Sequence, residues 1–312
     1  MTAHADESGT ELRSTSVARF PRHVYVLSAA LAVVGALATA LTYFDPGVLL
    51  GPAVTNGNAR GTALVMLAAA IPILLYAMWR AHQGSWRATF LWLGALFYLA
   101  YNAFLLLFLT PFNALFLLYV ATQSLALFST FALVFAIDRA WIMARIGRFA
   151  FRGLAIFVWT IVVLNTVAWL QVVIPAILSD DPTSFLDGLG VATNAIYVQD
   201  LVIWLPLMTL SAWWMWNRRP LGVILTGSWL IFGVLESVSI AVDQWFGHQA
   251  DPLSPHASEA VIPLMIGLAV VNLAGTYFYL RGRDAEEEIA PAPPLGRREP
   301  RRDVAPAQST DS

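Results

Sequence analysis

Eight long apolar segments, separated by short polar stretches, limit what this chain can fold into more than any other feature. Each has about the 20 apolar residues that a helix needs to cross the roughly 30 Å hydrocarbon core of a bilayer. Charged residues make up 12% of the chain, against about 25% in a soluble domain. The sequence therefore predicts an all-α, polytopic membrane bundle of eight transmembrane helices, at 24–44, 61–79, 88–109, 112–136, 153–178, 197–216, 221–246 and 260–280.

The basic residues give an orientation. All 18 are arginines, and only Arg60 falls outside the two terminal stretches and one alternating set of loops. Because basic residues concentrate in cytoplasmic loops, both termini are predicted to be cytoplasmic. The lysine-free, Ala-, Leu- and Arg-rich composition suggests a bacterial chain, so we expect a multi-pass protein of the bacterial cell membrane. The outer side is then acidic, with Asp45, Asp180, Asp181, Asp187, Asp200, Asp243, Asp251 and Glu259.

Several kinds of chemistry are excluded by composition. No cysteine is present, which rules out disulfides and thiolate metal sites. No lysine is present to form a retinal-type Schiff base. The chain contains no phosphate-binding glycine loop and no HExxH motif. We therefore expect no cofactor and no nucleic-acid partner; the expected partners are the lipid bilayer and a small solute or cation. The polar stretches 1–21 and 284–312 are predicted to be disordered cytoplasmic tails.

The two halves of the chain follow a similar order of residues. Asp-Pro at 45–46 and 181–182 ends the first and fifth segments. Pro72 and Pro206 lie in the second and sixth segments, and each is followed 30 residues later by a polar residue, Asn102 or Glu236. We therefore predict two four-helix units, 22–149 and 150–283. An even number of spans per unit gives parallel repeats, related by an axis along the membrane normal.

Four stretches are similar to sequences of an uncharacterised group of multi-span bacterial membrane proteins. They are LWLGALFYLAYN (91–102), FNALFLLYVA (112–121), TNAIYVQDL (193–201) and WNRRPLG (216–222). No activity is established for that group. The resemblance therefore implies a topology and no function.

Glu236 is the strongest candidate for a functional residue. It lies about 16 residues, or roughly 24 Å, into its span, where an ionised side chain costs a few kcal/mol and normally faces the bundle interior or a wet cavity. A polar stripe is expected to continue outward along the same helix face, and Asn102 is expected at a matching depth. The candidate substrate- or ion-binding residues are Glu236, Asp243, Asp200, Asn102, Ser239 and Tyr98.

Three functions remain open at this level. The first is a small-solute or ion carrier with an outward-opening polar cavity around Glu236. The second is a membrane enzyme for a lipid-soluble, prenyl-type substrate, with Glu236 or Asp243 as general acid in an aromatic-lined pocket. The third is a non-catalytic accessory protein, in which Glu236 is an interhelical hydrogen-bonding group.

Overall fold

The computed structural model describes residues 20–146 and 151–281. The predicted tails, 1–21 and 284–312, lie almost wholly outside these residues. Within the described ranges, eight helical spans are long and apolar enough to cross a membrane, which confirms the predicted all-α architecture. The spans are Arg22–Phe44 (α1), Ala53–His82 (α2 and α3), Trp86–Phe108 (α4), Phe116–Ala136 (α5), Phe151–Ile177 (α7), Ala195–Trp216 (α8 and α9), Pro220–Ala250 (α10) and Glu259–Leu280 (α11).

Two spans contain a short π-helical segment. The second consists of α2 (Ala53–Val65), a π segment at Met66–Ala70, and α3 (Ile71–His82). The sixth consists of α8 (Ala195–Gln199), a π segment at Asp200–Trp204, and α9 (Leu205–Trp216). Each π segment ends just before an apolar residue and a proline. Proline lacks an N–H and clashes with the preceding helical turn, and a wider turn accommodates it within a continuous span.

The second span begins eight residues before the predicted position 61, because its polar first turns pack against α10. Gly57 and Gly61 allow this approach. A Cβ on Gly61 would lie 2.5 Å from the Asp243 Cα atom, and one on Gly57 would lie 2.6 Å from the Phe246 carbonyl oxygen. Small residues four apart permit such close helix packing. The helix thus extends beyond the purely apolar run from which its start was predicted.

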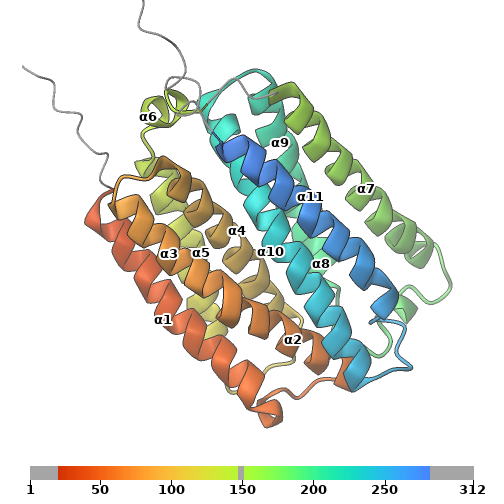
Figure 1. The fold of residues 1–312 in the computed structure, drawn as a ribbon. Helices are drawn as coiled ribbons and strands as arrows, with labels where there is room; N and C mark the ends of the chain where they lie inside the picture. Colours follow the sequence, from red (N-terminus) through yellow and green to blue (C-terminus); the bar gives the residue numbers. More distant parts are fainter. Residues whose placement is uncertain (1–19, 147–150, 282–312) are drawn as a thin grey trace, which may run out of the picture.

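The helices α4 and α10 form the centre of the bundle. They are the two most buried spans and pack against each other (Figure 1). Gly94 of α4 lies at their contact, where an added Cβ would be 2.6 Å from the Ile231 Cβ. In the first half of the chain, α3 and α5 pack against α4, and α1 packs against α5, α2 and α3. In the second half, α7 packs mainly against α9, and α11 packs against α10. The spans α7 and α11 are the least buried.

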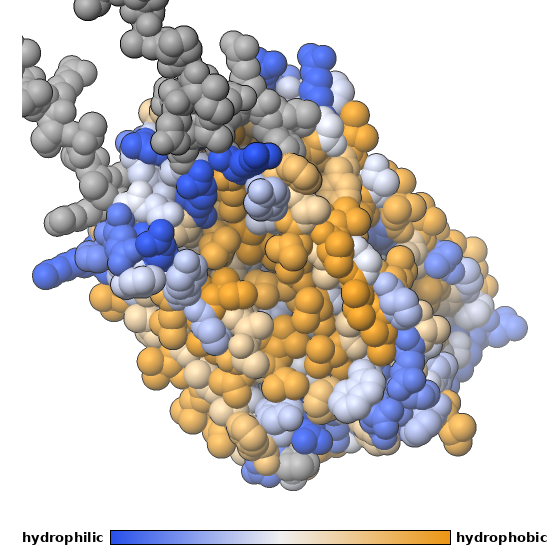
Figure 2. All heavy atoms as spheres, viewed as in Figure 1, coloured by the Kyte–Doolittle hydropathy of each residue, from blue (hydrophilic) through white to orange (hydrophobic). Residues whose placement is uncertain are grey.

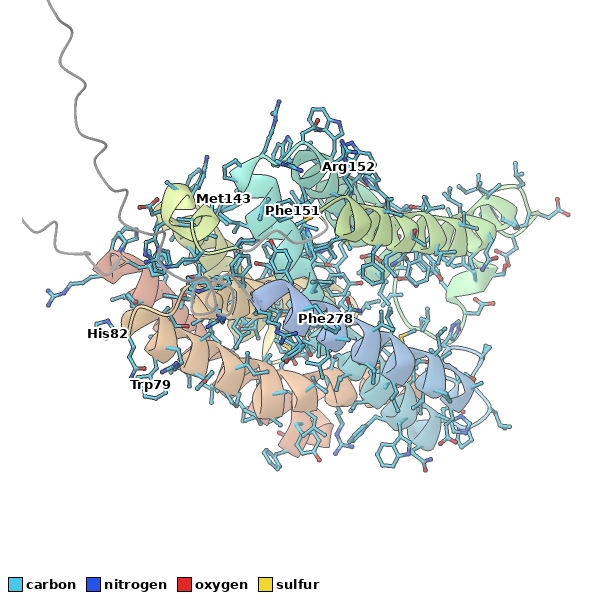
Figure 3. All side chains as sticks on the ribbon, turned by 45° about the horizontal axis from the view of Figure 1, so that its top comes forward. Trp79, His82, Met143, Phe151, Arg152 and Phe278 are labelled. Carbon is cyan, nitrogen blue, oxygen red and sulfur yellow. The ribbon has the colours of Figure 1, made fainter. Side chains whose placement is uncertain are left out.

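The bundle has two polar ends separated by an apolar band, which Figure 2 shows across one face. At one end, which we call the arginine end, the Arg87 Nε donates to the Leu280 carbonyl at 2.7 Å, and the Arg152 guanidinium lies 5.2 Å from the Trp216 ring centroid. Figure 3 labels His82, Met143 and Arg152 there, at the end of α3, in the short helix α6 (Arg139–Met143) and at the start of α7.

The opposite end, which we call the acidic end, is built from three loops that touch one another. The Thr55 hydroxyl donates to the Leu189 carbonyl at 2.9 Å, and the His256 Nε2 lies 2.6 Å from the Asp187 carbonyl oxygen. The segregation of charge along the chain is therefore also a segregation in space. Which end faces the cytoplasm stays a prediction from the arginines.

Candidate functional site

Glu236 is bonded across the centre of the bundle to the other central helix. Its Oε2 accepts a hydrogen bond from the Asn102 Nδ2 at 2.7 Å. The same amide nitrogen lies 3.2 Å from the Tyr98 carbonyl, which fixes its direction. Asn102 is buried and Glu236 is partly exposed. The two residues expected at matching depth are therefore direct partners.

Ser239 lies one helical turn beyond Glu236 on α10, toward the acidic end. Its Oγ accepts a hydrogen bond from the Tyr98 Oη at 2.9 Å, and both side chains are buried. Four of the six candidate residues therefore form two pairs between α4 and α10: Asn102 with Glu236, and Tyr98 with Ser239. These pairs continue the predicted polar stripe by one turn.

Asp243 lies one further turn toward the acidic end and is partly exposed. Its Oδ1 accepts a hydrogen bond from the Gln244 Nε2 at 3.3 Å, and the Thr62 hydroxyl of α2 is within hydrogen-bonding reach. The close packing of Gly61 against the Asp243 backbone brings Thr62 to this position. Asp243 is thus held by neutral donors.

Asp200 lies at the first position of the second π segment and is buried. Its Oδ2 accepts a hydrogen bond from the Trp169 Nε1 at 2.8 Å, and the Tyr101 hydroxyl is within hydrogen-bonding reach. Nothing in the sequence links residues 169 and 200, because the pairing depends on how α7 packs.

A cavity of about 330 Å³ lies at the acidic end. Its walls come from α2, α4, α7, α8, α10 and three loops. Asp243 lines this cavity, whereas Glu236 is not among its lining residues. This cavity therefore lies at Asp243, and Ser239 and Tyr98 form a hydrogen-bonded pair in the turn between the two acids. A cavity around Glu236 stays a prediction. The lining residues are Thr55, Asn58, Ala59, Thr62, Leu105, Leu106, Leu109, Thr110, Trp169, Leu189, Asn194, Ile196, Tyr197, Asp243, Gln244, Pro255 and His256.

Two other acids of the site, Asp243 and Asp200, act on Glu236 with a charge of its own sign. Asp243 lies two turns away on α10, and Asp200 lies in the π segment of the sixth span. The hydrogen-bond donors of the three carboxyl groups are neutral: an asparagine, a glutamine, a tryptophan and hydroxyl groups.

The other polar groups in the spans bond locally or lie apart from this site. The Asn272 Nδ2 donates to the Leu268 carbonyl of its own helix at 2.9 Å. The Gln123 Oε1 is buried without a hydrogen-bond partner. Among residues 20–146 and 151–281, no group of three or more His, Asp or Glu side chains is placed to hold a metal ion.

Comparisons with known protein families, with curated proteins and with solved structures find no match to this chain. The resemblance of four stretches to an uncharacterised group is therefore not supported by a family assignment. The class that the fold defines is a multi-span helical membrane protein.

Proposed function

We propose that this protein is a membrane carrier for a small cation and that Glu236 exchanges a proton or the cation during transport. The proposal depends above all on one observation: a carboxyl group in a central span accepts its hydrogen bond from a neutral amide, that of Asn102, at 2.7 Å. A buried acid that served packing alone would be better balanced by a basic partner, or replaced by an amide.

The charge balance supports this interpretation. In a low-dielectric interior, each of two like charges raises the free energy of the other's ionised form. Removing a carboxylate from water adds a further cost of several kcal/mol. Glu236, Asp243 and Asp200 can therefore all be ionised only when a cation enters. Without one, at least one of them retains a proton. Such a site couples proton occupancy to cation occupancy.

The order of the groups along α10 gives the site a direction. Asp243 borders the cavity, Ser239 and Tyr98 fill the next turn, and Glu236 and Asn102 lie beyond. In this proposal Tyr98, which is bonded to Ser239 in the turn between Asp243 and Glu236, acts as the gate between an accessible acid and a shielded one.

The proposed internal repeat supports a carrier in a second way. Asn102 and Glu236 are 134 residues apart, which is also the separation of Pro72 from Pro206 and of the two π segments from each other. If the units are related by a two-fold axis along the membrane normal, equivalent residues near that axis face each other, as Asn102 and Glu236 do. Repeats of this kind can rock against each other around a central site.

The aromatic residues beside the site do not favour the alternative of a prenyl-converting enzyme. The Phe97 and Trp229 rings stack at 4.3 Å, and the Trp204 and Phe232 rings stack at 5.9 Å. All four are buried. These rings fill the space between α4, the π segment at Asp200–Trp204 and α10, where an aromatic-lined pocket would otherwise hold a substrate.

Proteoliposomes that contain a trapped pH-sensitive dye test the proposal. Sodium, potassium and choline are added outside one at a time. We expect at least one of them to change the internal pH. Glu236→Gln should fold and insert but reduce the change to that of protein-free vesicles, since glutamine cannot exchange a proton. The matched control is Glu259→Gln, the same change at an exposed acid, which should keep wild-type flux.

Two outcomes would overturn the proposal: wild-type protein that moves protons with none of the cations, or Glu236→Gln protein that transports at the wild-type rate. Failure of both Glu236→Gln and Glu236→Leu to assemble would identify Glu236 as structural and favour the accessory alternative.

A further inference from the structure

We infer that the cavity at the acidic end binds a small organic cation with a substituted ammonium group. This inference rests on the proposed function in one respect: it names the class of solute that would enter the same route. It is argued from the cavity itself, which lies apart from Glu236 and can be tested by binding alone.

The charge of the cavity selects for a cation. Among the described residues that line it are one acid, Asp243, and no arginine. Asp243 accepts a hydrogen bond from Gln244 and has the Thr62 hydroxyl within reach, and neither group neutralises its charge. The one histidine of the lining, His256, is engaged with the Asp187 carbonyl oxygen. A ligand with a positive charge would supply the missing counter-ion.

Two aromatic rings of the cavity suit an ammonium with alkyl substituents. Trp169 and Tyr197 both line it, with ring centroids 4.7 Å apart and planes inclined by 42°. The bond from the Trp169 Nε1 to Asp200 fixes the indole, and Phe185 stacks on Tyr197 at 6.2 Å. Aromatic faces beside a carboxylate are the usual means of recognising quaternary ammonium groups.

The size of the cavity restricts the ligand further. Its volume of about 330 Å³ is at the lower end of the range of about 300–1,000 Å³ for small-molecule sites. A bare inorganic cation gains little from the apolar walls formed by Leu105, Leu106 and Leu109. A compact organic cation uses both the charge and the apolar walls. Choline has these properties and serves as the probe.

Calorimetric titration of the purified full-length protein tests the inference. The two probes are choline and 3,3-dimethyl-1-butanol, which is the neutral molecule with carbon in place of the quaternary nitrogen. We expect saturable binding of choline and at least about tenfold weaker binding of the neutral compound, because only choline interacts with the carboxylate and the ring faces. Sodium chloride at equal ionic strength controls for a general salt effect.

Variants identify the groups involved. Asp243→Asn should weaken choline binding about tenfold or more, whereas Asp180→Asn, the same change at an exposed acid of that end, should leave it unchanged. Tyr197→Leu should weaken binding, and Tyr197→Phe, which keeps the ring, should retain most of it.

The results separate this inference from the proposed function. Absence of choline binding, equal binding of the neutral compound, or unchanged binding by Asp243→Asn would overturn the inference, while cation-driven proton flux that needs Glu236 would still support the carrier. Choline binding that needs Asp243, without any flux, would support the inference and contradict the carrier.

Discussion

The two central helices occupy similar positions in the bundle but differ in their polar residues. Both α4 and α10 are largely buried, and each faces the other at its polar positions. At their closest polar contact, α4 provides the amide of Asn102 and α10 provides the carboxyl of Glu236. The helix α10 adds Asp243, whereas α4 has no Asp, Glu, His, Lys or Arg between Arg87 and its end at Phe108.

This difference separates a structural role from a functional one. Asparagine is sufficient to join two helices by a hydrogen bond, as many membrane proteins do. A carboxyl group provides the same bond and can also exchange a proton. We infer that α4 serves as the neutral scaffold and α10 as the helix that changes its charge.

The largest effect on transport is expected when the side chains of Asn102 on α4 and Glu236 on α10 are changed. Glu236→Asn alone should abolish transport, because the pair then has no carboxyl group. Adding Asn102→Glu returns a carboxyl and an amide to the same contact from opposite helices. If the two positions are related by the proposed repeat, the double variant should recover part of the flux, measured in the same proteoliposomes.

A fully inactive double variant with normal folding would show that the acid must lie on α10, in line with Ser239 and Asp243. The two helices would then not be interchangeable, and the repeat would lose its main functional support.

The close approach of the two helices can be tested at Gly94. Replacement by leucine places a side chain against Ile231, where the Cβ alone would be 2.6 Å from its neighbour. We expect a loss of about 1–3 kcal/mol in the free energy of unfolding, as for other overpacked sites, with a lower Tm in detergent. Gly267→Leu in α11 is the control, since nothing lies within 4 Å of an added Cβ there. Equal Tm values for the two variants would contradict the packing of α4 against α10.

The smallest effect is expected at the hydrogen bond between Tyr98 and Ser239. A double-mutant cycle of Tyr98→Phe and Ser239→Ala isolates its energy. Hydrogen bonds between transmembrane helices average about 0.6 kcal/mol, so we expect a coupling near that value from unfolding measurements. A coupling energy of zero would indicate that the two hydroxyl groups do not interact. The proposed role of Tyr98 as a gate would then lose its structural support.

The architecture could be predicted because it follows from local properties of the sequence. Twenty-residue apolar runs specify spans, and the isolated polar residues Asn102 and Glu236 could be recognised by their depth in them. The start of α2 was predicted too late, since Thr55 and Asn58 are polar residues whose helical state depends on glycine-mediated packing against α10.

The contacts of the site were harder to predict, because they depend on which helices become neighbours. Trp169 of α7 bonds to Asp200, and Thr62 of α2 approaches Asp243, although nothing in the sequence pairs these residues. The position of the cavity likewise follows from how side chains fill the turns of α10. Tyr98 and Ser239 form a hydrogen-bonded pair in the turn next to Glu236, and Asp243, one turn further, lines the cavity.

The most direct test of the central claim is infrared spectroscopy of the protein in lipid membranes, as the pH is varied and a transported cation is added. Our account expects the C=O stretching band of a protonated carboxylic acid that is absent in Glu236→Gln, present in Glu259→Gln, and decreased when the cation is added. A Glu236 band that does not change with pH or with the cation would show that this residue does not exchange its proton, and would contradict the account.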